Sequence, residues 1–239
     1  MNIDQRAILA AHNNADWYEA MFTSHNLRFD RRSYAFIGHD KPPPYYSNLT
    51  TLDPSNAHLV PQELSKLAQT FDGALGLKDS FCLLELKESG FEVLFEASWI
   101  WRQPEKTSMP NGWDVVSNGQ ELQDWEKAWK HNGSPTDQRI FPESLLSRSD
   151  VFFLGRKEGN KFTAGCIANT SDDCIGLSNV FAETPSQNSF FDAANATSSI
   201  ASQKPVVGYE SGADLGLAMS SNFQSVGKLR ILVTRCAQF

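Results

Sequence analysis

Two groups of polar side chains accompany apolar segments in the second half of the chain. Tyr209 and Glu210 close the apolar segment that begins at Val206, and Ser178 and Asn179 interrupt an earlier one. A carboxylate can take a proton from a nucleophile while a nearby phenol donates a hydrogen bond or a proton. The pattern therefore predicts acid–base chemistry, with Glu210 as the base and Tyr209 as the donor. The alternative for Glu210 is a structural role at the entry to a helix.

Three further residues are candidates for substrate contacts. Ser178 and Asn179 carry the hydroxyl and amide groups that bind small ligands, or they form a hydrogen-bonded β-bulge. Glu183 suits a cationic amine, or it is a solvated acid. The histidines are dispersed, and the cysteines show no CxxC spacing, so no metal site, disulfide framework or nucleophilic triad is predicted. The cysteines are Cys82, Cys166, Cys174 and Cys236.

The composition narrows the classes of partner. The chain has 239 residues and a formal net charge of −7. This charge argues against nucleic-acid and anionic-membrane partners, which both favour a basic surface. No apolar run reaches the ~20 residues of a membrane-spanning helix. The N-terminal residues do not have the pattern of a secretory signal peptide. We therefore expect a cytoplasmic protein with a small-molecule substrate.

Apolar periodicity predicts an alternation of helices and strands, which indicates the α/β class. Helices are expected at 4–25, 62–71, 79–89, 118–129, 141–147, 190–201 and 213–221. Strands are expected at 34–39, 45–52, 74–77, 91–102, 112–116, 151–156, 161–181 (a hairpin), 205–209 and 223–233. Ser211 can cap the last helix, and Asn222 can end it in the left-handed conformation. The polar connector at 103–111 is the predicted domain boundary.

The two halves of the chain resemble each other. YYSNLTTLDP at 45–54 is similar to GLSNVFAETP at 176–185, and SGFEVLFEASWIW at 89–101 to SNFQSVGKLRILV at 221–233. Both matches occur at nearly the same spacing, which favours an internal duplication. The predicted halves are residues 1–103, the shorter one, and 112–239. The alternative is that any two α/β units look alike.

A family resemblance follows from the same segments. A helix ending in Asn222-Phe223, then Gly227 and a basic-apolar strand, resembles the end of the GNAT acyltransferase fold. The element order of residues 112–233 is similar to the whole of that fold. The resemblance implies a tandem GNAT-like protein, with an acyl-CoA-dependent N-acyltransferase that acts on a small amine or amino-acid-like substrate. The competing class is a non-catalytic GNAT-like domain that binds a small ligand or a protein partner.

The resemblance also implies where each group would bind. The fourth and fifth strands of the GNAT fold splay apart, and Ser178 and Asn179 would lie at that opening, where open sheets bind ligands. Acetyl-CoA would be the cofactor, and it would lie along the end of the fourth strand and the start of the next helix. The residues implied for this contact are Val180, Phe181, Gln187 and Asn188.

Two marks of the family are missing. The segment 182–189, where the family has a glycine-rich loop for the pyrophosphate, contains no glycine. It carries the acid Glu183, and Pro185 removes a backbone donor. The tyrosine that serves as general acid in the family is replaced by Ala218, and by Leu86 in the first half. We therefore predict that acetyl-CoA binds weakly.

Overall fold

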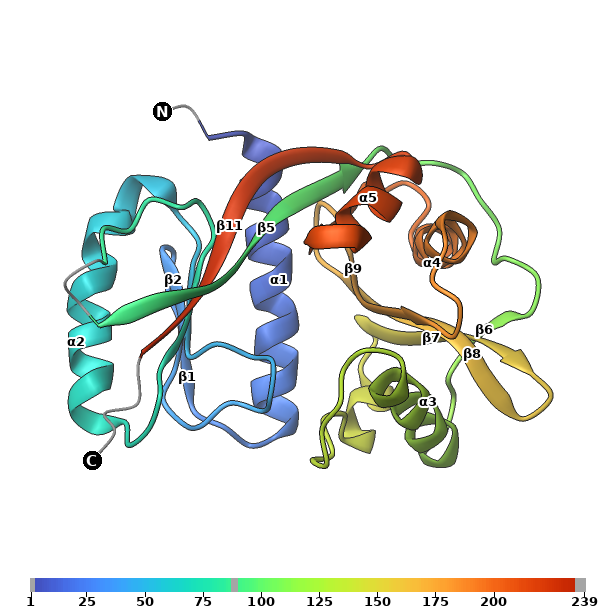
Figure 1. Ribbon diagram of the computed structural model, residues 1–239, viewed down its shortest axis with the longest axis horizontal. Coiled ribbons are helices and arrows are strands. Elements are labelled where there is room, and N and C mark those ends of the chain that lie inside the picture. Colours follow the sequence, from blue (N-terminus) through green and yellow to red (C-terminus); the bar gives the residue numbers. More distant parts are fainter. Residues whose placement is uncertain (1–2, 87–89, 235–239) are drawn as a thin grey trace.

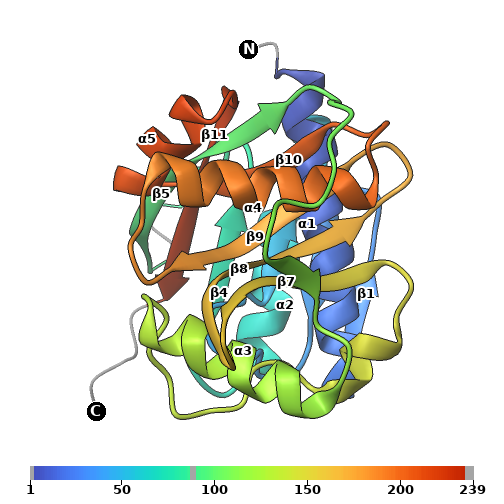
Figure 2. The ribbon, with the colours of Figure 1, turned by 90° about the vertical axis from the view of Figure 1, so that its right-hand side faces the viewer.

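The computed structural model describes residues 3–86 and 90–234. Within these residues, one mixed sheet of eleven strands has the order β1-β2-β3-β4-β11-β5-β10-β9-β8-β7-β6, with helices on both faces (Figures 1 and 2). The strands are β1 (Phe29–Arg31), β2 (Ala35–Gly38), β3 (Leu49–Thr51), β4 (Gly76–Asp79), β5 (Phe91–Arg102), β6 (Trp113–Val115), β7 (Val151–Glu158), β8 (Lys161–Thr170), β9 (Ile175–Ala182), β10 (Val206–Glu210) and β11 (Gln224–Thr234). The helices are α1 (Gln5–Ser24), α2 (Val60–Thr70), α3 (Gly119–His131), α4 (Gln187–Ile200) and α5 (Gly212–Ser220), with two 3₁₀ helices, η1 (Pro54–Leu59) and η2 (Glu143–Ser147). The predicted α/β class is confirmed.

Helix α1 lies across the middle of the sheet, and five of its ten buried residues are alanines. Asp4 caps the helix by accepting the backbone N–H of Arg6. Small residues let the helix axis approach strands β5, β8, β9, β10 and β11, which α1 contacts. Larger rings from α1 and α3 then fill the core on this face of the sheet. The buried small residues of α1 are Ala7, Ala10, Ala11, Ala15 and Ala20.

Two smaller cores complete the packing. Helices α4 and α5 cover β8 to β10 from the face opposite α1, around Phe190 and Phe223. Helix α2 covers β2, β3 and β4, with Leu64 and Leu67 in a separate cluster. The sheet is therefore covered by helices on both sides at the level of β10, which is where the polar candidates of the sequence lie.

The long strands β5 and β11 form the centre of the sheet. They pair antiparallel from Phe91 to Trp101, and β5 also pairs with β10 while β11 pairs with β4. Residues 103–110 of the connector predicted at 103–111 have no regular structure. Nevertheless, the sheet continues across it, because a strand of each half lies between strands of the other. A duplication of the halves 1–103 and 112–239 stays a prediction.

Most predicted elements are found at their expected places. Asn118 caps α3 by accepting the backbone N–H of Glu121, and Asn222 has the left-handed φ of 66°. Three details differ. Ser211 occupies the N-cap position of α5, but its side chain makes no capping hydrogen bond. The short helix predicted at 141–147 is a 3₁₀ helix, η2, and it covers Glu143–Ser147. The short strand β1 was not predicted.

The helix predicted at 79–89 is wrong over residues 79–86, and residues 87–89 lie outside the described part. Asp79 ends β4, and its carboxylate accepts the backbone N–H groups of Leu83 and Leu84. Cys82 has φ 54°, which a helix does not tolerate. The apolar spacing that suggested a helix instead buries Leu84 and Leu86 in the α2 core.

The described residues contain neither a membrane-spanning helix nor a metal centre. None of their helices is both long and apolar enough to cross a membrane. No three His, Cys, Asp or Glu side chains among them are placed to hold a metal ion. Cys82, Cys166 and Cys174 are free thiols, and burial raises the pKa of Cys166 and of Cys174 to about 12. Cys236 lies outside the described residues.

Candidate functional site

The parallel strands β9 and β10 separate soon after they begin. They pair at only two positions, Ile175 with Val206 and Gly176 with Val207. Beyond these, the edges that the two strands turn toward each other have no ladder partner. Gly208 stands at the divergence: a Cβ there would lie 2.5 Å from the backbone oxygen of Leu177. A glycine thus allows the strands to start as neighbours and then part.

A β-bulge in β9 widens this gap. The pairing of β8 with β9 shifts its register between Gly165 and Ile167, opposite Phe181 and Ser178. Asn179 lies in the bulge with φ 52°. Its amide Nδ2 donates to the hydroxyl of Ser178 at 3.1 Å. The structural alternative for these two residues, a hydrogen-bonded bulge, is therefore present in the structure.

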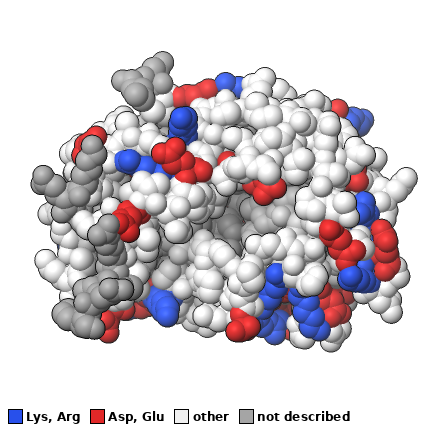
Figure 3. Space-filling view, in the orientation of Figure 1, with Lys and Arg blue, Asp and Glu red and all other residues white. Residues whose placement is uncertain are grey.

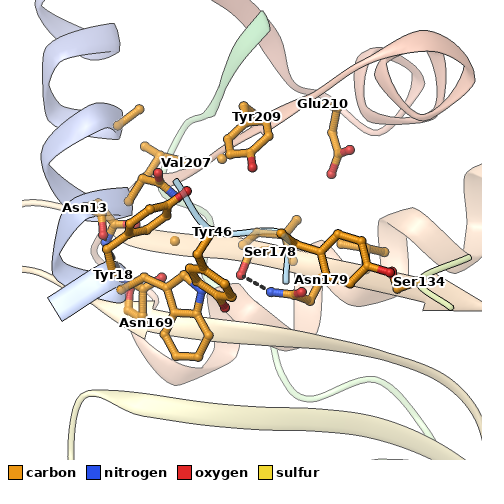
Figure 4. Close-up of a pocket in the computed structure, with 18 of the residues that line it drawn as sticks. Asn13, Tyr18, Tyr46, Ser134, Asn169, Ser178, Asn179, Val207, Tyr209 and Glu210 are labelled. Carbon is orange, nitrogen blue, oxygen red and sulfur yellow. Dashed lines mark hydrogen bonds between the residues drawn. The ribbon is translucent and has the colours of Figure 1, made fainter. Parts of the chain in front are cut away.

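A cavity of about 230 Å³ lies over the gap. Ser178, Asn179, Tyr209 and Glu210 all line it, and Figure 4 shows Tyr209 and Glu210 on β10 pointing toward the other two. The face seen in Figure 3 is hollowed near its centre, between the two ends of the sheet. The structure thus brings together four of the five predicted catalytic and substrate-binding residues.

Glu183 is the exception. It does not line the cavity, and its carboxylate forms an ion pair with Lys161 beyond the end of β9. The geometry matches its alternative interpretation, a solvated acid at the surface.

Glu210 has an unusual environment for a carboxylate. Within the described residues it has neither a hydrogen-bond partner nor an ion-pair partner, although it lies in the wall of the cavity. Burial raises the pKa of Glu210 to about 8, and the nearby negative charge of Asp214 adds to this effect. A carboxylate with a pKa near neutrality can both take up and release a proton under physiological conditions.

Tyr209 lies beside it with its phenol in place as a donor. Its ring packs edge-on against Trp99 at 5.6 Å, which fixes its orientation. Burial is the main cause that raises the pKa of Tyr209, with the charges of Tyr18 and Glu210 as smaller causes. The phenol therefore keeps its proton and remains a hydrogen-bond donor.

Several lining residues come from parts of the chain that sequence reasoning did not connect with the site. Helix α1 contributes Asn13, Asn14, Trp17 and Tyr18, and the loop after three prolines contributes Tyr45 and Tyr46. Two signals were available. Adjacent asparagines interrupt an otherwise apolar helix face, and Tyr45-Tyr46 follow a stiff proline segment. Only the tertiary structure shows that both point to one cavity.

Lys78 is a buried base immediately behind this lining. It is fully buried on β4, and its Nζ lies 4.7 Å from the ring centre of Tyr18 and 4.3 Å from that of Tyr209. It donates to Oδ1 of Asn14 at 2.6 Å. Burial lowers the pKa of Lys78 to about 7, so the amine is partly uncharged at neutral pH.

The fold of this chain is also found among solved structures. A scan of protein-family models finds no match for the chain, and neither does a search of curated proteins. Among solved structures, a GCN5-related N-acetyltransferase from Kribbella flavida superposes with a TM-score of 0.66 at 13% identity, over 96% of this chain and 97% of that one. The chain has the GNAT fold.

Two further structures support this assignment. A putative GNAT acetyltransferase from Novosphingobium aromaticivorans has a TM-score of 0.59 at 10% identity, covering 91% of this chain and 96% of that one. An N-myristoyltransferase from Saccharomyces cerevisiae has a TM-score of 0.54 at 8% identity, covering 84% of this chain and 64% of that one. Identities this low show the GNAT fold of the chain, so activity has to be argued from the site.

The residues beside the gap fit the acyl-pantetheine arm of acyl-CoA. A second cavity of about 160 Å³ lies between the end of β9, the start of α4 and α5. Val180 and Phe181, two of the predicted cofactor residues, line it together with Phe190 and Leu217. Val180 and Glu210 line both cavities, so the second one leads toward the first. The unpaired backbone along β9 can hydrogen-bond the amides of such an arm.

The start of α4 offers less to the nucleotide end. Ser186 and Ser189 form a capping box, in which each side-chain oxygen accepts the other's backbone N–H. Pro185 has no N–H to offer. Gln187 and Asn188 are exposed there, and the side chain of Gln187 donates to the backbone oxygen of Ser220. The two predicted cofactor residues on α4 thus lie apart from the second cavity.

Proposed function

We propose that the chain transfers an acyl group from an acyl thioester, such as acetyl-CoA, to a small amine bound in the cavity between β9 and β10. The observation that supports this most strongly is the unpartnered carboxylate of Glu210 within a gap that fits a thioester arm. An acid without partners in a cavity wall lowers stability, so its retention points to a role in chemistry.

The residues present are sufficient for the chemistry. Acyl-CoA, when bound, supplies an acyl carbon held by a C–S bond. The bound ammonium group first releases one proton to solvent. As the uncharged nitrogen then forms its new C–N bond and the C–S bond breaks, Glu210 takes a second proton from the nitrogen. The phenol of Tyr209 donates a hydrogen bond to the departing sulfur, which takes the proton from Glu210 and leaves as the thiol, so Glu210 is a carboxylate again and Tyr209 has kept its proton. Since Ala218 on α5 has no hydroxyl, Tyr209 replaces the helix tyrosine of the family in this scheme.

The acceptor amine has to lie close to the acyl carbon in an orientation that allows attack, and the walls of the cavity can hold it there. Walls from α1, β9 and β10 meet over the gap. Amine attack on a thioester depends mainly on orientation, which raises the effective concentration of the two reactants. A modest base and a single donor are therefore enough for turnover.

A non-catalytic domain that binds a small ligand is the second candidate. It is favoured by one specific observation, the self-satisfied capping box at the start of α4, where the fold would otherwise hold a pyrophosphate. In this case, the cavity would bind a ligand without turnover.

Isothermal titration with acetyl-CoA and with acetyl-pantetheine separates the candidates. We expect both to bind in the high micromolar range and with similar affinity, because the nucleotide end has little to hold it. Addition of an amine should then release free thiol, measured with a thiol reagent. If neither thioester binds at millimolar concentration, the acyltransferase proposal fails and the ligand-binding domain is favoured. Low-micromolar binding of acetyl-CoA alone would show that the pyrophosphate is gripped elsewhere.

A further inference from the structure

The walls of the first cavity are unusually aromatic. Six rings line it, and they come from four separate parts of the chain: α1, the loop before β3, α3 and β10. Several of them contact one another edge to face, such as Tyr18 and Tyr46 at 5.0 Å between ring centres. Such contacts restrain the rings, so the parts of them that line the cavity form a preformed wall for a flat ligand. The six are Trp17, Tyr18, Tyr45, Tyr46, Trp129 and Tyr209.

Tyr45 forms the most informative part of this wall. Its side chain is 56% exposed, and its backbone has φ 75°, which a bulky residue rarely adopts. The hydroxyl donates to the backbone oxygen of Pro135 at 2.8 Å, and the ring rests edge-on against Trp129 at 5.7 Å. An exposed ring held by a strained backbone gains little for the core. Strain of this kind gathers at binding sites, where the surrounding structure maintains it.

The charges of the lining are equally selective. Glu210 is the only Asp, Glu, Lys, Arg or His among the described residues that line the cavity. The nearest base beneath the lining, Lys78, has its Nζ bound to Asn14 and covered by the rings of Tyr18 and Tyr209. The described lining therefore offers one acidic partner to a positive charge, assisted by aromatic rings, and no cation to a carboxylate.

The size of the cavity sets a further limit. Its volume of about 230 Å³ lies below the ~300–1,000 Å³ of pockets for drug-sized ligands. The acyl group and the amine have to share the space near the gap. A ligand with one aromatic ring and a short aminoalkyl chain matches these dimensions better than a larger one.

We propose that the acceptor is an aralkyl primary amine without a carboxylate, with its ring against the aromatic wall and its ammonium group at Glu210. This inference rests on the proposed function for its catalytic meaning, but it concerns binding of the amine alone. It replaces the amino-acid-like substrate, because an amino acid would bring a carboxylate into a cavity with no cation to pair it.

Binding of three matched amines to the full chain, measured by isothermal titration without any thioester, tests the proposal. The probes are 2-phenylethylamine, phenylalanine, which adds a carboxylate, and n-butylamine, which lacks the ring. We expect 2-phenylethylamine to bind at least tenfold more tightly than either of the others. Equal or tighter binding of phenylalanine overturns the proposal, as does equal binding of n-butylamine or no binding of any probe.

Two variants locate the contacts. Tyr45→Ala should weaken 2-phenylethylamine binding about five- to tenfold and leave n-butylamine unchanged, because it removes ring contact alone. Met219→Ala serves as the matched control, since Met219 is exposed outside the cavity. If Tyr45→Ala weakens both amines equally, the ring wall does not select the ligand. Failure here leaves the acetyl-CoA and acetyl-pantetheine titration intact, so the two proposals can fail separately.

Discussion

The sheet contains two parallel strand pairs, β3–β4 and β9–β10, and each second strand ends in an acid. Asp79 ends β4 and Glu210 ends β10. Asp79 is 1% exposed and fully partnered: two nitrogens of Arg230 lie within 3.0 Å, and two backbone N–H groups donate to it. Glu210 has no such partner within the described residues. The same position in two similar settings thus holds a structural acid and a candidate catalytic one.

The strands around these acids differ in the same sense. Asn48 bridges β3 to β4, since its Oδ1 accepts the backbone N–H of Gly76 at 3.0 Å, and the Thr51 hydroxyl accepts that of Ser80. The β9–β10 pair has a bulge at Asn179 and a cavity instead. Side chains that satisfy the backbone close the first pair, whereas the second leaves backbone and carboxylate for a ligand. This comparison shows that the opening is local, and it can be tested on each side.

The largest effect is expected at the closed pair. Asp79→Asn should lower the free energy of unfolding by about 3 kcal/mol, because Arg230 loses the charge that compensates it. Urea denaturation measures this. The control Asp124→Asn removes an exposed pair with Lys127 and should cost less than about 1 kcal/mol. Equal losses in the two variants would show that Asp79 is not structural.

Glu210→Gln should instead lower activity strongly and leave stability largely unchanged. We expect acyl transfer to fall about 100-fold or more, because the base is lost. In the unchanged protein, activity should rise with pH through about 8, the pKa of Glu210. Because this pKa is raised by folding, the stability linked to Glu210 is present at low pH and is lost as pH rises through about 8. The variant should therefore be at least as stable as the original protein above pH 8 in urea denaturation.

The pH profile offers a matched control for that prediction. Asp214→Asn removes a charge that raises the pKa of Glu210, so the rise in activity should move to lower pH with the maximum rate retained. A large stability loss in Glu210→Gln with activity retained would mark Glu210 as a structural residue, like Asp79.

Intermediate effects on the free energy of unfolding are expected at Asn48 in the closed pair and Asn179 in the open pair. Asn48→Ala should cost about 1–3 kcal/mol of unfolding free energy, because the buried N–H of Gly76 loses its acceptor. Asn179→Gly should change stability by less than about 1 kcal/mol, since glycine adopts the observed positive φ readily. Thermal and urea unfolding of both variants would check this. A greater loss at Asn179 than at Asn48 would contradict the distinction between closed and open pairs.

The smallest effect is expected at Lys78, the residue before Asp79. Its pKa is lowered by folding from 10.5 to about 7, so the stability linked to it is present at high pH and is lost as pH falls through about 7. Between pH 8 and pH 7 the original protein should lose roughly 1 kcal/mol more than Lys78→Met does. Lys127→Met, at an exposed site, should follow the original protein. Parallel curves for all three would show that Lys78 stays charged.

Apolar periodicity and capping residues were sufficient to predict most of the elements and to propose Tyr209 and Glu210 as candidate site residues. The periodicity of α1, the cap at Asn118 and the turn at Asn222 depend on residues within a few positions of one another. Tyr209 and Glu210 could be proposed as candidates because they end an apolar strand, and their roles stay predictions. Ser178 and Asn179 were proposed in the same way. The bulge that contains Asn179 also forms part of the cavity wall.

What the tertiary structure alone decided depends on contacts between distant segments. The pairing of β5 with β10 and of β11 with β4 joins residues more than a hundred positions apart, and no local period encodes such partners. The same contacts explain why residues 79–86 do not form a helix: Asp79 pairs with Arg230 of β11, and the Arg230 side chain donates to the Asp79 carboxylate. They also bring Tyr45 from a loop to line the same cavity as Glu210. Sequence determines each side chain's chemistry within its own element, whereas burial and partners, which set the pKa of Glu210, arise only when the elements pack.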